Sequence, residues 1–170
     1  MLALLGDTHG ETDHRLSGRT RAAVRAAEQV CHTGDFTTPA VYEALVAAAG
    51  ADAAGETDLT AVYGNSDTAA LRDRLSETAT VEYDGVRLAL AHGHRHDRTS
   101  LGLLARQAGA DVVAVGHSHR HGIEQLGDAL LVNPGSHADP RGGRTTHAEL
   151  DGGRIAIRTP EGDTLAERTL

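Results

Sequence analysis

One pattern recurs along this chain: an apolar segment of strand length ends at a glycine beside a side chain that can bind a metal. The segments are Gly6-Asp7-Thr8-His9, Gly34-Asp35, Gly64-Asn65-Ser66-Asp67, His92-Gly93-His94 and Gly116-His117-Ser118-His119. Apolar runs at 2–5, 61–63, 86–91 and 112–115 precede most of them. Because the carboxyl ends of parallel strands open into one crevice, the repetition predicts that these side chains lie together.

Taken singly, each segment has an ordinary reading as a turn or as a loop with exposed histidines. Taken together, carboxylate, amide and imidazole groups form a mixed oxygen and nitrogen donor set, which suits hard or borderline divalent cations better than a thiolate zinc site does. One ion cannot use all of these donors. Two ions about 3.5–4 Å apart, bridged by a carboxylate, can use them, and such a pair activates water and clamps phosphoryl oxygens. The pattern therefore indicates metal-assisted hydrolysis.

The order of elements predicts an α/β fold. Strands at 2–5, 29–32 and 61–63 alternate with helices at 19–29, 38–49 and 68–76, which favours parallel pairing with right-handed crossovers. Hairpins follow at 80–91, 122–133 and 147–158, with a helix at 100–107 and a strand at 112–115 between them. We expect two mixed β-sheets packed face to face as a sandwich with helices outside. We expect residues 1–170 to form a single domain, with the tail after about residue 160 loosely attached.

Composition indicates the environment and the partners that suit the protein. All 16 basic residues are arginine, 24 residues are acidic, and the net charge is −8. Such a lysine-free acidic surface is expected of a halophilic, haloarchaeal protein, although codon usage in a GC-rich genome would also favour arginine and alanine; we favour the first explanation. Negative charge disfavours binding to long nucleic acid. Cys31 is alone, so no disulfide framework is possible. We see no signal peptide and no membrane span, and we expect a cytoplasmic protein.

The motifs GDTH, GD, GNSD, HGH and GHSH, in this order, resemble those of the calcineurin-like metallophosphoesterases. The small YfcE-like phosphodiesterase subfamily is the most similar, because Asn133-Pro134-Gly135-Ser136 and Pro140-Arg141 also match its C-terminal signature. The resemblance runs from residue 2 to about residue 158. It implies a four-layer αββα fold, a small phosphate-ester substrate and, as is common among relatives, a possible homodimer.

The resemblance also implies roles for individual residues. Asp7, His9 and His119 would hold one divalent metal ion; Asn65, His92 and His117 would hold a second; Asp35 would bridge the two. Manganese is the first expectation for both ions, followed by nickel, cobalt, iron or zinc. A hydroxide that bridges the metals would attack phosphorus in line, and diesters are favoured over monoesters. His94 would contact the substrate or neighbouring groups, and Asp67 would orient a neighbour.

One residue departs from the pattern of the larger family members. They have histidine after the asparagine, where it helps to protonate the leaving group, whereas this chain has Ser66. Serine is a poor general acid. We therefore expect a preference for good leaving groups, or a proton that comes from His94 or from metal-bound water.

Several alternatives remain open at this stage. The run His92-x-His94-x-His96-Asp97 superficially resembles the HxHxDH motif of metallo-β-lactamase-type hydrolases, but its order differs. A scaffold or binding module with a weak or inactive site is the main rival to an enzyme, and the filled ligand positions favour the enzyme. The substrate could also be a nucleotide monophosphate or a cyclic nucleotide.

The other histidines and one arginine have weaker roles in this reading. We expect His96 and His121 at the rim of the site. We expect no ligand role for the four histidines His14, His32, His137 and His147, and we expect Arg141 either near a substrate phosphate or exposed.

Overall fold

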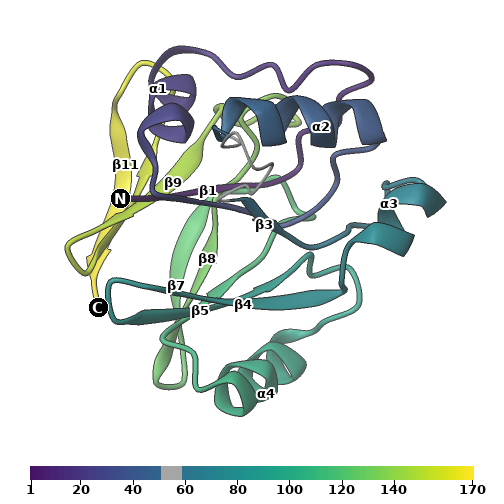
Figure 1. Cartoon of the computed structure of the whole chain (residues 1–170). Helices are drawn as coiled ribbons and strands as arrows, with labels where there is room; N and C mark the ends of the chain where they lie inside the picture. Colours follow the sequence, from purple (N-terminus) through teal and green to yellow (C-terminus); the bar gives the residue numbers. More distant parts are fainter. Residues whose placement is uncertain (51–58) are drawn as a thin grey trace.

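A computed structural model describes residues 1–50 and 59–170 of the chain. Within them, a six-stranded sheet has the order β11-β10-β9-β1-β2-β3 (Figure 1). Strands β1, β2 and β3 pair in parallel, and β9, β10 and β11 extend the sheet antiparallel from the other side of β1. The bounds of these strands are Leu2–Leu5 for β1, Gln29–His32 for β2, Leu59–Ala61 for β3, His147–Asp151 for β9, Arg154–Arg158 for β10 and Thr164–Thr169 for β11.

A second, five-stranded sheet has the order β4-β5-β6-β8-β7. Its central strands β5, β6 and β8 are parallel, and each edge is an antiparallel hairpin partner. The bounds are Thr78–Tyr83 for β4, Val86–Ala91 for β5, Val112–Ala114 for β6, Gly122–Leu126 for β7 and Ala129–Asn133 for β8.

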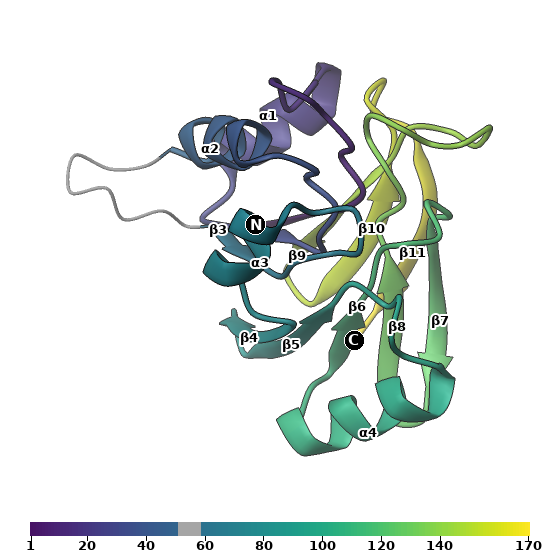
Figure 2. The ribbon, with the colours of Figure 1, turned by 90° about the vertical axis from the view of Figure 1, so that its right-hand side faces the viewer.

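The two sheets pack face to face with helices outside, which confirms the expected fold class (Figures 1 and 2). Alternate residues of β1 face opposite sides: Leu2 and Leu4 join the core between the sheets, whereas Ala3 and Leu5 join the core under the helices. Strands buried on both faces read as continuous apolar runs. Helices α1 (Gly18–Ala26) and α2 (Pro39–Ala48) cover the first sheet, and α4 (Arg98–Ala108) covers the second.

Local capping explains where most helices begin and end. At the start of the helix expected at 38–49, the Thr38 hydroxyl oxygen accepts a hydrogen bond from the Val41 N–H, and Pro39 occupies the first turn. Asp97 caps α4 in the same way, so this helix begins two residues before the expected start, and Gly109 ends it in a left-handed conformation. Ser17 precedes α1, but its side chain makes no capping bond. The short helix α3 spans Ala69–Arg74.

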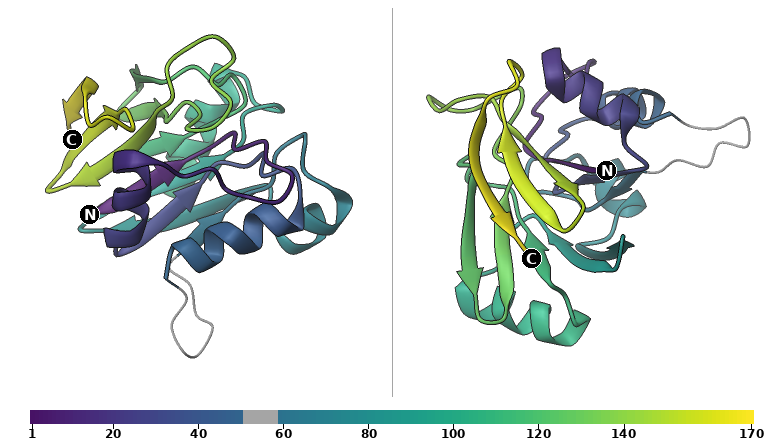
Figure 3. Two further views of the ribbon diagram at one scale, coloured as in Figure 1. Left: turned by 90° about the horizontal axis from the view of Figure 1, so that it is seen from above. Right: turned by 90° about the vertical axis from the view of Figure 1, so that its left-hand side faces the viewer.

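Further differences from the prediction concern α1 and the end of the chain. Helix α1 ends at Ala26, because the chain must turn before β2 begins at Gln29. The segment after residue 160 is not loosely attached: β11 pairs along β10 and contacts β7 of the other sheet (Figure 3). Its residues are mostly exposed or half-buried, so its attachment depends on backbone hydrogen bonds to β10, which leave little apolar signal in the sequence.

Within the described residues, none of the helices has the length and hydropathy needed to cross a membrane. Cys31 is fully buried in β2, and burial raises the pKa of its thiol to about 12, so this side chain is a packing residue.

A buried polar cluster joins β9 to α1. The Glu149 carboxylate accepts hydrogen bonds from Arg19 Nε (2.8 Å) and Nη2 (2.7 Å), and also from His147 Nε2 (3.0 Å). His147 Nδ1 lies 3.0 Å from the Thr20 hydroxyl oxygen. Burial raises the pKa of Glu149, but the hydrogen bonds from His147 and Arg19 outweigh it and lower the pKa to about 2. The charged carboxylate therefore stabilises the folded chain.

We predict that Glu149→Gln lowers the free energy of unfolding at pH 7 by about 2–3 kcal/mol. Because the pKa of Glu149 is depressed from 4.5 in the ordinary state to about 2 in the fold, its contribution is fully present above pH 4.5 and is lost as the pH falls toward 2. Chemical denaturation at several pH values measures this. Glu82→Gln is the control, because the Glu82–Arg87 pair is exposed and should contribute less than about 0.5 kcal/mol. Equal losses in the two variants would contradict the prediction.

Candidate metal centre

The predicted donor residues lie on loops at the carboxyl ends of strands from both sheets, and backbone contacts tie these loops together. The Asp7 N–H donates to the Gly34 carbonyl oxygen at 3.0 Å, which joins the loop after β1 to the loop after β2. The His117 N–H donates to Asp7 Oδ1 at 2.9 Å, which joins the loop after β6 to the same place. His92, after β5, donates from Nδ1 to the Thr33 carbonyl oxygen at 2.8 Å. The sandwich thus gathers the donors at one edge.

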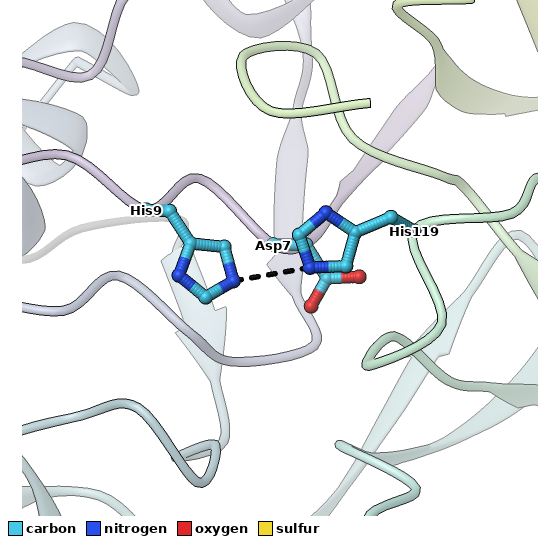
Figure 4. Close-up of side chains that lie close together, drawn as sticks. All are labelled: Asp7, His9 and His119. Atoms are coloured by element: carbon cyan, nitrogen blue, oxygen red, sulfur yellow. Dashed lines mark hydrogen bonds between the residues drawn. The ribbon is translucent and has the colours of Figure 1, made fainter. Parts of the chain in front are cut away.

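Asp7, His9 and His119 form one group that could hold a metal ion (Figure 4). The two imidazole rings stack with centroids 4.8 Å apart, and their Nε2 atoms are 3.1 Å apart. His119 Nδ1 donates to the Asp139 carbonyl oxygen, so the Nε2 lone pair of His119 is available toward His9.

Asp7, Asp35 and His92 form a second group. His92 Nε2 lies 3.2 Å from Asp35 Oδ2 and 3.1 Å from the Asn65 amide oxygen. Because the Thr33 carbonyl oxygen can only accept, Nδ1 carries a proton, so a neutral His92 would present its Nε2 lone pair to a metal ion, whereas a protonated His92 donates from Nε2 to Asp35. Asp35 Oδ2 is also 3.3 Å from His9 Nε2, so this carboxylate lies between the two groups. Asp7 belongs to both groups, a feature that the sequence did not indicate.

Two further predicted ligands lie at the mouth of the site. Asn65 and His117 are exposed, whereas Asp7, Asp35, His92 and His119 are buried. The His117 ring meets the His92 ring edge-on at 5.3 Å. The structure therefore brings all seven predicted ligands to one place, with a buried floor and an open mouth.

The electrostatics of the floor fit a bound cation. Burial raises the pKa of Asp7, and its Oδ2 atom is buried without a hydrogen-bond partner. Burial also disfavours ionised Asp35, but hydrogen bonds from His9 and His92 hold the pKa of Asp35 well below its ordinary value. In turn, Asp35 raises the pKa of His92 despite the opposing effect of burial. A buried, unpartnered carboxylate oxygen is costly, and a divalent ion among these oxygen and nitrogen donors would satisfy it.

Asp67 and Ser66 position Asp35. Asp67 accepts hydrogen bonds from the backbone N–H groups of Asp35 (3.0 Å), Thr37 (2.7 Å) and Gly64 (2.7 Å). Ser66 donates to Asp35 from its N–H (2.7 Å) and from its hydroxyl (3.0 Å). The expected orienting role of Asp67 thus acts on loop backbone and not on a histidine ring.

The glycines of the recurring pattern allow close approach of the loops. A Cβ atom at Gly64 would overlap Asp35 Oδ1, and one at Gly116 would lie 3.1 Å from Asp7 Oδ1. Five of the predicted ligands themselves have left-handed backbone conformations, which non-glycine residues rarely adopt. They are Asp7 (φ 51°), His9 (44°), Asp35 (62°), His117 (67°) and His119 (58°). Such strain persists only where the surrounding structure holds it.

The remaining histidines lie outside the two donor groups. Burial lowers the pKa of His32 well below its ordinary value; its Nε2 lies 2.9 Å from the Thr8 hydroxyl, and its ring stacks on Phe36. Burial lowers the pKa of His137 to about 4. The turn at 133–136 has a supporting role, because the Ser136 hydroxyl donates to the Asp7 carbonyl oxygen at 2.6 Å. Ser136 is a positioning residue that only its place in the motif could have signalled.

Comparison with known proteins agrees with this geometry. Residues 1–152 match the family model described as the calcineurin-like phosphoesterase superfamily domain. The chain belongs to this superfamily. Among curated metallophosphoesterases, it is 33% identical over 172 residues to YsnB of Bacillus subtilis, with 97% of this chain and 87% of YsnB covered. It is 28% identical over 151 residues to a phosphodiesterase of Methanocaldococcus jannaschii, with 79% and 82% covered.

Solved structures show that this metallophosphoesterase chain shares its fold with other proteins. YfcE, a phosphoesterase from E. coli, superposes with a TM-score of 0.73 at 21% identity, covering 99% of this chain and 98% of that one. Vacuolar protein sorting 29 from Cryptosporidium parvum superposes with a TM-score of 0.75 at 17% identity, covering 99% and 97%.

We predict that Gly64→Ala in this metallophosphoesterase weakens divalent-metal binding about 10- to 100-fold, because the added methyl group displaces the Asp35 carboxylate. Calorimetric titration with Mn²⁺ measures this, and circular dichroism checks folding. Gly102→Ala, within α4 and with only Leu126 nearby at 4.0 Å, is the control and should bind Mn²⁺ like the wild type. Unchanged affinity in a folded Gly64→Ala variant would contradict the prediction.

Proposed function

We propose that this chain is a phosphodiesterase that uses two divalent cations. The observation that carries the proposal is the position of Asp35, whose Oδ2 atom lies 3.3 Å from His9 Nε2 and 3.2 Å from His92 Nε2. A carboxylate between two sets of donors is what a bridged metal pair requires. Membership of the superfamily supports hydrolysis of phosphate esters, and the phosphodiesterase name of the archaeal relative supports diesters.

The donor set divides into two sites under this proposal. Asp7, His9 and His119 would hold one ion, Asn65, His92 and His117 the other, and Asp35 would contact both. Mixed oxygen and nitrogen ligands suit manganese first, with nickel, cobalt, iron and zinc as further options. When bound, the ions supply Lewis acidity and make hydroxide available near neutral pH. The protein holds these donors rigidly and places a small phosphate ester at the open mouth.

His94 would position the substrate. Its ring is half-buried, 5.3 Å from the His92 ring and 6.3 Å from the His117 ring, and its Nδ1 atom is buried without a partner. Burial and the neighbouring His92 lower the pKa of His94, so the ring is neutral near pH 7 and offers one N–H donor to a phosphoryl oxygen. The Ser66 hydroxyl points at Asp35 and away from this role. Without a strong proton donor, good leaving groups are favoured.

We predict that Asp35→Asn lowers kcat/KM for a bis-aryl phosphate diester about 100-fold or more, because a neutral amide would hold two divalent cations less strongly than a carboxylate does. The assay uses added Mn²⁺ at low and multimolar salt and measures phenol release. Chelation should abolish wild-type turnover, and Mn²⁺ should restore it.

Asp163→Asn is the matched control, since Asp163 pairs with Arg144 on the surface far along the chain from the donors. It should retain wild-type turnover. Folded wild-type protein without turnover under any divalent metal would contradict the enzyme proposal and favour a binding module of the same fold.

A second prediction concerns the leaving group. We expect kcat/KM to fall about 100-fold or more from a p-nitrophenyl diester to the phenyl diester, because no residue supplies a proton efficiently. His94→Ala should lower kcat/KM about tenfold for both substrates alike, as loss of a positioning hydrogen bond does. A loss confined to the phenyl diester would instead show that His94 protonates the leaving group.

A further inference from the structure

Two cavities flank the His117-Ser118-His119 turn. The apolar cavity, of about 390 Å³, includes His117 in its lining, and the arginine cavity, of about 420 Å³, includes His119. Ser118, Arg120 and His121 line both cavities and separate them. Because His117 and His119 belong to opposite sides of the proposed metal pair, each cavity adjoins one side of the position that a scissile phosphate would take.

The apolar cavity is suited to an uncharged group. Leu101 of α4, Val115 just after β6 and Leu131 of β8 form its apolar walls. Arg120 and Glu124 also line it and offset each other in charge, and the Glu124 carboxylate is paired with Arg98 at 2.9 Å. An aryl or alkyl alcohol of the ester fits these surroundings.

The arginine cavity is more positively charged, because it adds Arg141 to the shared Arg120. Arg120 and Arg141 line it together with Pro140 and two glycines, and no carboxylate is among its lining residues. Within residues 1–50 and 59–170, the Arg120 guanidinium makes no hydrogen bond or ion pair, and Arg141 contacts only Asp139, with Nε 3.6 Å from Oδ2. The chain as a whole has a net charge of −8, so a cavity lined by two arginines differs in sign of charge from the molecule as a whole. Guanidinium groups bind phosphate with paired hydrogen bonds.

The geometry points to an asymmetric phosphodiester as substrate: one alcohol is uncharged and lies in the apolar cavity, and the other carries a second anionic group, such as a phosphate, which Arg120 and Arg141 bind. This inference rests on the proposed function, because the scissile phosphate must lie at the metal centre between the cavities. It explains why Arg120 and Arg141, which have few polar partners, line one cavity together with His119, a predicted metal ligand.

The test compares two p-nitrophenyl phosphodiesters with the same leaving group. In one, the second alcohol is ethanol; in the other, it is 2-phosphoethanol. We expect the Mn²⁺-loaded wild type to prefer the phosphorylated diester at least tenfold in kcat/KM, mainly through KM. Arg120→Ala and Arg141→Ala should each reduce this preference about tenfold. Arg144→Ala is the matched control, because Arg144 lies in the same loop, pairs with Asp163 and does not line the cavity, and it should keep the wild-type preference.

A binding measurement separates the two proposals. Inorganic phosphate is titrated calorimetrically into the full chain after chelation of metals, and Arg120→Ala and Arg141→Ala should weaken its Kd about tenfold relative to Arg144→Ala. Absence of any preference between the diesters in an active wild type, or equal effects of all three arginine variants, would overturn the inference. If neither diester is hydrolysed, the proposed function fails, and the phosphate titration still decides whether the arginine cavity binds anions.

Discussion

The close approach of two buried carboxylates, Asp7 and Asp35, is the constraint on which the site depends. Backbone hydrogen bonds join their two loops, and the loops that carry Gly64 and Gly116 can approach the carboxylate oxygens because these glycines have no Cβ atom. Five of the candidate donor residues have left-handed backbone conformations at this place. Asp67 holds the loop of Asp35 through three backbone N–H groups, and Ser136 holds the loop of Asp7. The folded chain therefore holds the two carboxylates and the strained loop backbone in place before any ion binds. A divalent cation is suited to offset the negative charge of these carboxylates.

Much of the fold could be predicted because local signals agreed with the final structure. Apolar runs predicted the buried strands. The helix expected at 38–49 forms α2, whose start fits Thr38 as the capping residue and Pro39 in the first turn, and the hairpin expected at 80–91 forms around the residue pair Asp84-Gly85. Strand β11 could not be predicted, since its residues are mostly exposed and its attachment comes from backbone hydrogen bonds to β10. The strand expected at 61–63 lies at Leu59–Ala61, because its register is set by pairing with β2 and not by its apolar residues alone.

The candidate donors could be named from the sequence, but their arrangement could not. Repetition of glycine beside aspartate, asparagine and histidine predicted that these side chains lie together, since parallel strands bring their carboxyl ends together, and the family resemblance implied the seven ligand roles. The structure brings these side chains to one place. The groups that orient these donors are backbone atoms far away in the sequence: the Thr33 carbonyl for His92 and the Asp139 carbonyl for His119. Backbone carbonyls carry no sequence signature, so only the folded chain shows which of them fixes each ring. For the same reason, the sequence does not show that Asp7 belongs to both donor groups.

The buried floor of the site and the two cavities beside it differ in how firmly the fold holds them. The floor is buried and cross-linked by hydrogen bonds to both sheets, which suits groups whose positions must be held closely. The two cavities beside it are lined partly by exposed loop residues, among them Arg120 and Arg141, and partly by buried residues such as Leu101 of α4. Exposed loop residues can vary without disturbing the sandwich. Under the proposed function, changes at these loop residues would alter which esters the site accepts while the candidate donors keep their positions.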